Sequence, residues 1–531
     1  MRRLAWAFAL FLAVFAGGCG DKAPETKVQP ATATTLTVLA GSELRDIEPL
    51  LPMIQAATGV TLQLKYSGTL EAVERLQAGE PFDTAWLSSN RYALLTPGAR
   101  ERIRASERTM ITPVVLGLKA SKAKELGWLD NPNVTWKDVA EAAGRGRFTF
   151  GMTSPSASNT GFSGLFGLAA ALANKGDALE AKDVDAKRLA AFFKAQRVTA
   201  GSSGWLAEAY VKEQDRLDGM INYANVLLAL NRSGQLKEPL ALIYPKEGIL
   251  SADYPLMLLD PGKRDAYDKL ITYIRSAEFQ KAMYETTLRR PINPNVTVDP
   301  KLYPPTLIEL PFPASLDVVN AVLESFDNEL RRPADATFVL DVSGSMKGAR
   351  LDALRGAMLA LAGGDASISG RYARFRNRER IVVLPFSNLP MAAQVFELGA
   401  EREANARAIE KVKSTVSGLD ANGGTAIFSA LRAAYRAALE RRKADHAADR
   451  YYSIVLMTDG ENRDGDSASD FERWYKSLPA ADQGIRIFPI LFGEAKPTEL
   501  EAVAQLTGGR VFDGRKAGSL AAVFKEIRSY Q

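Results

Sequence analysis

Five oxygen-bearing residues in the second half of the sequence follow apolar runs or a pair of glycines. They are Asp341, Ser343, Ser345, Thr425 and Asp459. Alternate residues that leave a strand point the same way, so the Asp-x-Ser-x-Ser group at 341–345 can present three oxygens to one point. Two carboxylates and three hydroxyls are hard ligands of the kind that Mg²⁺ prefers, with Ca²⁺ and Mn²⁺ as alternatives. We therefore predict an oxygen-ligated divalent-metal site.

A second set of polar residues lies nearer the N-terminus, at the ends of strand-like runs or before an apolar helix pattern. It comprises Ser42, Ser67, Ser88, Ser89, Ser158 and Asn159. In open α/β sheets, ligands bind beyond the carboxyl ends of the strands, where hydroxyls and free backbone N–H groups suit a polar or anionic ligand. Each of these residue types is also a common helix cap, so capping remains an alternative for any single one.

Strand-like and helix-like segments alternate around both sets and must position them. The apolar strand-like runs lie at 36–41, 60–68, 337–340, 381–386, 452–457 and 485–492. Helix patterns follow most of them, including those at 70–78, 350–361, 426–439, 498–506 and 520–527. This alternation predicts an α/β fold with parallel sheets covered by helices.

The helix start Ser158-Asn159-Thr160-Gly161 and the segments 219–225 and 243–260 carry a more specific likeness. With the opening strand–helix–strand, they make residues 36–300 resemble a bacterial periplasmic solute-binding protein of the two-lobed, type II kind. The resemblance implies two α/β lobes joined by strands that cross near 112–117 and 240–250, with a solute in the cleft. It places the six polar residues above, together with Tyr223, at a small polar or anionic solute. No family-specific arginine clamp is evident, so the solute is left open, as is a fold kept only for sensing or docking.

The order of the five metal-site residues along 335–531 is similar to that of a von Willebrand factor type A (VWA) domain. The resemblance implies a doubly wound, Rossmann-like parallel sheet and a metal-ion-dependent adhesion site. Asp341, Ser343, Ser345, Thr425 and Asp459 would bind the metal directly or through water. In this family, an acidic residue of a protein partner completes the metal coordination.

The first 19 residues have the pattern of an export signal. Arg2 and Arg3 precede an apolar run at 4–15 and the small residues before Cys19. That run has fewer than the roughly 20 residues that a bilayer-spanning helix needs, which favours a secretory signal over a permanent membrane helix. The segment resembles a bacterial lipobox, which implies cleavage before Cys19 and a lipid on its sulfur, with ordinary secretion as the alternative. The protein is then expected in the cell envelope, held to a membrane by this lipid.

Composition helps to define the domains. We expect a signal peptide at 1–18, a polar, Pro/Thr-rich tether at 19–35, a solute-binding-like domain at 36–310, a linker helix at 311–334 and a VWA domain at 335–531. Apolar residues at helical spacing in the linker predict that its helix packs on a neighbouring domain and fixes the two domains relative to each other.

Composition also narrows the function. One cysteine and one histidine, His446, exclude an intramolecular disulfide and multi-histidine metal centres. The 67 basic residues are nearly balanced by 62 acidic ones, which gives no support for nucleic-acid binding. No catalytic motif is apparent, and His446 lies in a charged stretch. We therefore expect a non-enzymatic, lipid-anchored binding protein. The alternatives are a solute receptor for an ABC-type transporter with an accessory VWA domain, and a metal-dependent hydrolase.

Overall fold

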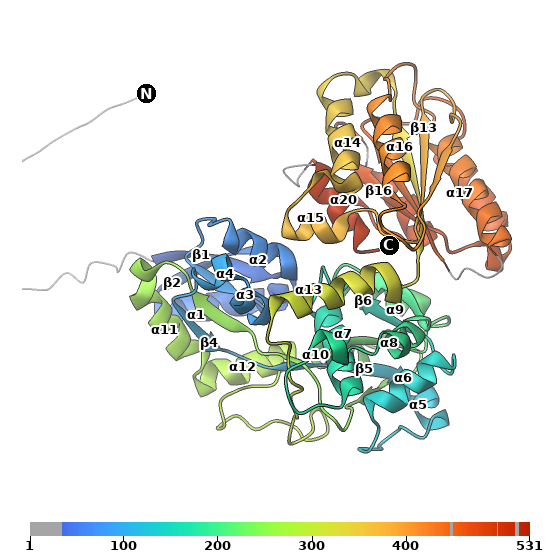
Figure 1. Cartoon of the computed structure of the whole chain (residues 1–531). Coiled ribbons are helices and arrows are strands. Elements are labelled where there is room, and N and C mark those ends of the chain that lie inside the picture. The colour runs from blue at the N-terminus through green and yellow to red at the C-terminus, as the bar shows by residue number, and fades with distance from the viewer. Residues whose placement is uncertain (1–33, 446–449, 496, 516–519) are drawn as a thin grey trace, which may run out of the picture.

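The computed structural model describes residues 34–445, 450–495, 497–515 and 520–531. A two-lobed N-terminal domain lies beneath a C-terminal domain, and a helix joins them (Figure 1). The predicted signal peptide, Cys19, nearly all of the tether and His446 lie outside the described residues. Within the described part of the chain, no helix combines the length and the apolar character needed to cross a bilayer.

The first lobe is built on a five-stranded sheet with the order β2-β1-β3-β11-β4. Its strands are β1 (Thr34–Gly41), β2 (Val60–Ser67), β3 (Thr84–Trp86), β4 (Ala105–Arg108) and β11 (Pro255–Leu258). Its helices are η1 (Ser42–Leu50), α1 (Leu51–Thr58), α2 (Thr69–Gln77), α3 (Arg91–Leu95), α4 (Pro97–Arg100), η3 (Pro261–Lys263), α11 (Arg264–Ile274) and α12 (Ala277–Thr287). Strand β1 pairs in parallel with both β2 and β3, so the polar residues after these strands meet at one sheet edge.

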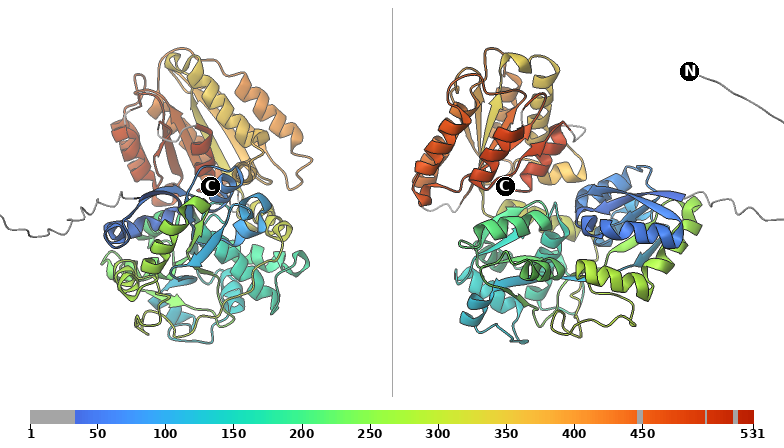
Figure 2. Two further views of the ribbon diagram at one scale, coloured as in Figure 1. Left: turned by 90° about the vertical axis from the view of Figure 1, so that its left-hand side faces the viewer. Right: turned by 180° about the vertical axis from the view of Figure 1, so that it is seen from behind.

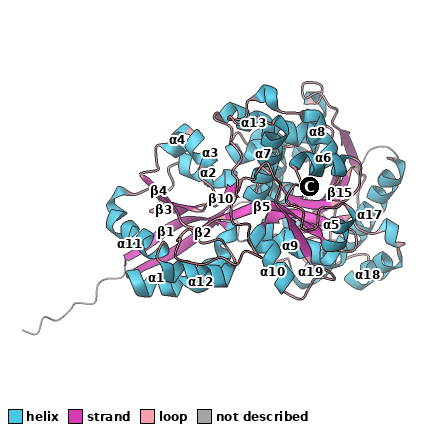
Figure 3. Ribbon diagram, turned by 90° about the horizontal axis from the view of Figure 1, so that it is seen from below, coloured by secondary structure: helices cyan, strands magenta, loops and turns pink. Residues whose placement is uncertain are grey.

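The second lobe carries the sheet order β10-β5-β8-β6-β7, with β9 also paired to β5. Its strands are β5 (Thr112–Lys119), β6 (Phe150–Thr153), β7 (Gln196–Ala200), β8 (Gly219–Tyr223), β9 (Leu240–Ile243) and β10 (Ser251–Ala252). Its helices are α5 (Ala120–Glu125), α6 (Trp136–Gly144), α7 (Asn159–Ala173), η2 (Ala181–Asp183), α8 (Ala186–Phe193), α9 (Ser203–Glu213) and α10 (Ala224–Arg232). Seen from below, helices surround the sheets of both lobes (Figure 3).

The two lobes are connected where the chain crosses between their sheets. The first connection enters β5, as the sequence predicts. The second was predicted at 240–250, but β9 pairs with β5 inside the second lobe. The return instead runs through β10, which pairs antiparallel with the start of β5, and into β11 of the first lobe. The apolar residues of β9 resemble a crossing strand in sequence, but their pairing partner decides where the strand lies.

The predicted linker helix is present as α13 (Leu316–Ser325), which continues into the π-helical turn η4 (Phe326–Leu330). The side chain of Ser315 caps it by accepting a hydrogen bond from the Val318 N–H. Its apolar face, including Val319 and Leu323, belongs to the hydrophobic core of the N-terminal domain. The helix therefore packs on the neighbouring domain, as its spacing predicts.

The C-terminal domain has one six-stranded sheet with the order β14-β13-β12-β15-β16-β17. Its strands are β12 (Ala334–Asp341), β13 (Arg380–Phe386), β14 (Gln394–Glu397), β15 (Tyr451–Thr458), β16 (Arg486–Leu491) and β17 (Phe512–Asp513). All pair in parallel except the edge strand β14, which is antiparallel to β13. Strand β12 is buried along its whole length, which explains its continuous run of mostly apolar residues.

Helices cover both faces of this sheet, as expected for a doubly wound fold (Figure 2). They are η5 (Gly344–Met346), α14 (Ala349–Leu359), η6 (Ala360–Gly364), α15 (Ile368–Ala373), α16 (Ala406–Ser417), α17 (Ile427–Ala444), α18 (Ala468–Ser477), η7 (Ala480–Asp482), α19 (Pro497–Thr507) and α20 (Leu520–Arg528). One hydrophobic core lies under α14, α16 and α20, and a second lies under α17, α18 and α19.

Candidate functional site

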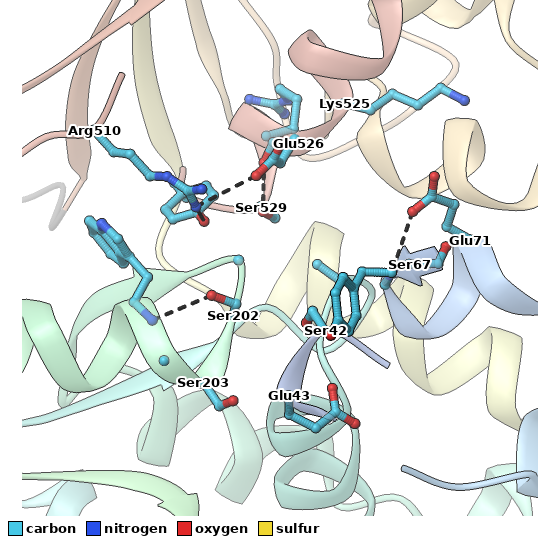
Figure 4. A pocket seen from close by; sticks show the side chains of 18 of the residues that line it. Ser42, Glu43, Ser67, Glu71, Ser202, Ser203, Arg510, Lys525, Glu526 and Ser529 are labelled. Carbon is cyan, nitrogen blue, oxygen red and sulfur yellow. Dashed lines mark hydrogen bonds and ion pairs between the residues drawn. The ribbon is translucent and has the colours of Figure 1, made fainter. Parts of the chain in front are cut away.

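A cavity of about 1150 Å³ lies where the two lobes and the C-terminal domain meet. The first lobe contributes Ser42 and Glu43, the second contributes Ser202 and Ser203, and the C-terminal domain contributes Ser529 (Figure 4). Its volume is somewhat above the roughly 300–1,000 Å³ that is typical of small-molecule sites. The lobes touch beside the cavity, because the N–H at the start of α2 donates to the Ala157 carbonyl of the second lobe at 3.2 Å.

Three of the seven residues predicted at the solute line this cavity: Ser42, Ser67 and Tyr223. The other four are not among its lining residues. Asn159 and Ser88 are nevertheless buried, and the Asn159 side-chain amide donates to the Tyr223 hydroxyl at 3.2 Å. The remaining two serines make local contacts, Ser89 accepting from the Arg91 N–H and Ser158 lying 3.1 Å from the Thr160 hydroxyl.

Several buried polar atoms around the cavity have no hydrogen-bond partner among the described residues. They include Glu43 Oε1, Ser67 Oγ and Asn159 Oδ1. Leaving such an atom buried without a partner costs about 1–3 kcal/mol, so a cluster of them indicates a place where a polar ligand is accommodated. Burial raises the pKa of Glu43, although its own backbone N–H, Ser88 and Arg289 counter part of the shift.

The sequence prediction missed the charged residues beneath the cleft. Arg289 is 1% exposed, donates to Asp46 Oδ1 at 2.6 Å and to the Glu43 carbonyl at 3.0 Å, and lies 4.5 Å from the ring centroid of Tyr254. It comes from the segment after α12, more than 240 positions from its partners. No strand end or helix start marks it, so no local pattern in the sequence points to it.

The second candidate site is a chain of oxygen atoms at the carboxyl ends of β12 and β15. Asp341 Oδ1 accepts from the Ser343 N–H at 2.8 Å, and the two hydroxyls of Ser343 and Ser345 lie 3.0 Å apart. The Ser345 hydroxyl then donates to Asp459 Oδ1 at 2.8 Å. Asp341 and Asp459 are buried, whereas Ser345 is exposed, so the cluster opens to solvent at Ser345.

Thr425 lies on a neighbouring loop. This loop is attached to the Asp-x-Ser-x-Ser segment, because the Gly344 N–H donates to the Gly423 carbonyl at 3.0 Å. The Thr425 N–H donates to Asp464 Oδ2 at 2.8 Å. A Cβ at Gly424 would lie 1.9 Å from the same oxygen, so any larger residue would have to displace the Asp464 side chain. The structure thus brings all five predicted metal-site residues to one edge of the sheet.

The donor set fits a hard divalent cation. Burial raises the pKa of Asp341, Asp459 adds to the shift, and hydrogen bonds from Ser343 and Thr458 oppose it. A cation would relieve the cost of burying these two carboxylates. Within the described residues there is no group of three or more His, Cys, Asp or Glu side chains able to hold a metal, so a metal here must also use hydroxyls. Whether the five residues bind a metal remains a prediction.

One basic residue in this cluster was not foreseen. Arg350, in the first turn of α14, donates to Asp459 Oδ2 at 2.5 Å and lies 3.8 Å from Glu494. It sits five residues after Ser345, on the helix that the sequence predicts there. The sequence predicts that Arg350 begins the helix after the Asp-x-Ser-x-Ser motif. It does not predict that the Arg350 side chain contacts Asp459.

Family comparisons match both parts of the chain. The model of the bacterial extracellular solute-binding protein family matches residues 36–286. The model of the von Willebrand factor type A domain matches residues 335–526. The second match contains all five residues of the oxygen cluster, and the first contains all seven residues predicted at the solute.

Curated relatives share only part of the chain. An uncharacterized protein of Synechocystis is 30% identical over 185 residues, which are 34% of this chain and 38% of that protein. Calcium-activated chloride channel regulator 1 of Bos taurus is 28% identical over 111 residues, 21% of this chain and 11% of that protein. The chain therefore spans well under half the length of either relative.

Solved structures align with about half of the chain. The sulfate-binding protein SubI from Mycobacterium tuberculosis is 17% identical, with 54% of this chain and 96% of that chain covered and a TM-score of 0.41. The substrate binding protein of an ABC transporter from Agrobacterium tumefaciens is 13% identical, with coverages of 57% and 95% and a TM-score of 0.44. On the family matches, this chain consists of a bacterial extracellular solute-binding domain at residues 36–286 followed by a VWA domain at residues 335–526.

Proposed function

We propose that this chain is a non-enzymatic, lipid-anchored binding protein of the cell envelope. Its VWA domain binds a protein partner through a divalent cation, and its solute-binding domain binds or senses a polar solute. The observation that carries the proposal is the hydrogen-bonded cluster in which Asp341 accepts from the Ser343 N–H and the Ser343 and Ser345 hydroxyls lead to Asp459. This arrangement is sufficient to hold a cation that binds a partner, and a binding role of this kind requires no catalytic group.

The metal would be held by Asp341, Ser343, Ser345, Thr425 and Asp459. A bound dication would supply positive charge for which an acidic side chain of the partner is the natural counterpart. The exposed hydroxyl of Ser345 marks the side from which the partner would approach. The protein residues keep the two carboxylates buried and fixed by hydrogen bonds, so the site is preorganised before the partner arrives.

Metal binding can be tested by titrating Mg²⁺ into the purified chain and into two aspartate variants. Asp341→Ala removes a buried ligand and should abolish binding. Asp352→Ala on the following helix is the matched control, because Asp352 is 69% exposed and pairs only with Arg355. Partner capture from envelope extracts should disappear with EDTA and with Asp341→Ala alike. Capture that survives both treatments would contradict the proposal.

A solute receptor for a transporter is the second candidate function. The closed contact between the lobes and the unpartnered atoms Glu43 Oε1, Ser67 Oγ and Asn159 Oδ1 favour it. A thermal-shift screen with oxyanions and small polar metabolites should give saturable stabilisation, about 2.7 kcal/mol at a hundredfold excess over Kd. Glu43→Gln should change that response, whereas the exposed Glu101→Gln should not. A silent screen over a broad panel would leave a docking or sensing role for this domain.

The lipid anchor rests on Cys19 in the sequence. Cys19→Ser should move the exported chain from the membrane fraction to the soluble fraction without altering its folding, because the described domains begin at residue 34. The hydrolase alternative predicts Mg²⁺-dependent turnover of ester or phosphate substrates that Ser343→Ala abolishes. Turnover of this kind would replace the binding function proposed here.

A further inference from the structure

The C-terminal end of the VWA domain forms the roof of the cavity between the solute-binding lobes. The roof residues include Arg510, Lys525, Glu526, Ser529 and Tyr530, and all line the cavity together with the lobe residues. Figure 4 shows Arg510, Lys525, Glu526 and Ser529 above the cleft, with Ser42 and Glu43 of the first lobe and Ser202 and Ser203 of the second lobe beneath. The roof is thus made by a domain that is separate from the two lobes.

The roof rests on the second lobe through aromatic and ionic contacts. The rings of Trp205 and Tyr530 are perpendicular, with centroids 4.8 Å apart. Arg486 of the VWA domain forms an ion pair with Glu213 and lies 5.6 Å from the Trp205 ring. Tyr530 is only 1% exposed, so this contact is well packed.

The VWA domain also touches the first lobe. The Ser369 N–H of the VWA domain donates to Glu74 Oε2 on α2 at 2.9 Å. Burial raises the pKa of Glu526 on α20, and Arg510 opposes this shift. Glu71 of α2 lies near enough to raise the Glu526 pKa further. The VWA domain therefore spans the mouth between α2 and α9, one helix on each lobe.

We propose that the VWA domain is a lid on the solute cleft, so that a solute enters or leaves when the lid lifts from α9 and α2. This inference rests on the proposed solute binding and adds its regulation. The closed arrangement is the stable one, and opening breaks the Trp205–Tyr530, Arg486–Glu213 and Ser369–Glu74 contacts. A solute that touches the roof stabilises the closed lid. A partner that binds only the lifted VWA domain therefore lowers the affinity for solute. By linkage, the solute lowers the affinity for that partner by the same factor.

The lid can be tested without knowing the solute, through the reactivity of a thiol inside the cavity. Cys19 is the only cysteine, so the full chain with Cys19→Ser is free of native thiols. Ser67→Cys in this background places one thiol in the cavity at a position that is 6% exposed. The reporter is the rate of its modification by a bulky charged maleimide. Thr272→Cys, at an exposed position of α11, gives the rate of an open thiol.

A bulky substitution under the roof, here called the wedge, is used to lift the lid. A Cβ at Gly201 would lie 2.4 Å from Ser529 Oγ and 2.5 Å from a ring carbon of Tyr530, so Gly201→Gln forces the roof away. Gly176→Gln in the same lobe is the matched control, because nothing lies within 4 Å of its Cβ. Small-angle scattering on each variant measures whether the domains separate.

We expect Gly201→Gln to speed modification of the Ser67→Cys thiol at least tenfold. Gly176→Gln should leave its rate unchanged, and the Thr272→Cys rate should be the same in all backgrounds. The proposal is overturned if the cavity thiol already reacts as fast as the exposed one. It is also overturned if the wedge separates the domains without changing the rate, or if the domains stay together despite the wedge. If Gly201→Gln speeds thiol modification but no compound in the thermal-shift screen stabilises the chain, only the proposed solute binding is contradicted.

Discussion

The guanidinium of Arg350 contacts Asp459, a carboxylate that is also predicted to bind the metal. Its guanidinium pairs with Asp459 Oδ2, while Asp459 Oδ1 accepts from Ser345. A divalent cation bound between Asp341 and Asp459 would lie near this guanidinium and be repelled by it. Arg350 is therefore expected to weaken metal binding and to hold Asp459 in place when no metal is bound.

Replacing Arg350 tests this role. Arg350→Gln should tighten Mg²⁺ binding by roughly fivefold, since partly exposed charge pairs are worth about 0–1 kcal/mol. Isothermal titration calorimetry measures the change. Arg432→Gln is the control, because Arg432 is 34% exposed, close to the 35% of Arg350, and pairs with Asp466, which is not a predicted ligand. Equal affinities in the parent and in Arg350→Gln would contradict this role of Arg350.

The helix α13 connects three bodies through a single side chain. Asn320 Oδ1 accepts from the Tyr92 hydroxyl of the first lobe at 3.2 Å and from the Tyr372 hydroxyl of the VWA domain at 3.0 Å. Both tyrosines are buried. Burial also raises the Tyr92 pKa to about 12 although Arg371 opposes the shift, so this hydroxyl remains a donor at ordinary pH. Asn320 thus ties the linker helix to both domains.

Asn320→Ala should lower the free energy of unfolding by about 1–3 kcal/mol, because it leaves two buried hydroxyls without their acceptor. Urea unfolding measures the loss, and Ala321→Ser at the next, exposed position of the helix is the control. In a Tyr372→Phe background the same substitution should cost less. Costs that add fully in the double variant would show that the Asn320–Tyr372 hydrogen bond contributes nothing.

At the scale of the whole molecule, Glu379 joins the linker, the VWA sheet and the C-terminal helix. It accepts from Arg528 of α20 at 2.7 Å and forms an ion pair with Arg331 at the end of the linker. A second buried pair, Arg376 with Asp327 at 3.3 Å, lies beside it. Burial alone would raise the Glu379 pKa, but Arg528, Arg331 and Arg376 outweigh it and lower the pKa to about 2.

The lowered pKa sets the sign of a pH effect. Glu379 contributes stability above its usual pKa of 4.5, and this contribution is lost as the pH falls toward about 2. Glu379→Gln should destabilise the chain by about 3–5 kcal/mol near neutral pH, since it leaves buried guanidinium groups unpaired. The deficit should shrink between pH 4.5 and about 2. Urea unfolding across pH measures it, with the half-exposed Glu397→Gln as the control. A deficit independent of pH would contradict this role.

Much of the architecture follows from local sequence patterns. Buried parallel strands such as β12 and β15 are continuous apolar runs, and the residues after them necessarily meet at one sheet edge. This rule alone predicts that Asp341, Ser343 and Asp459 lie close together. It also explains why Ser42 and Ser67 line one cavity. The crossing that the family resemblance implied at 240–250 was misplaced, because a short apolar strand such as β9 does not encode its pairing partner.

The sequence alone determined the α/β order of the elements and the oxygen cluster, because strand and helix periodicity and short motifs are properties of neighbouring residues. The two domain types followed from the resemblance of its motifs to known families. The tertiary structure alone decided that Arg289 lies beneath the cleft, that Arg350 pairs with Asp459, and that the VWA domain covers the solute cavity. Each of these depends on side chains more than 100 positions apart. Such contacts are fixed by how the lobes and the VWA domain pack, which no local pattern records.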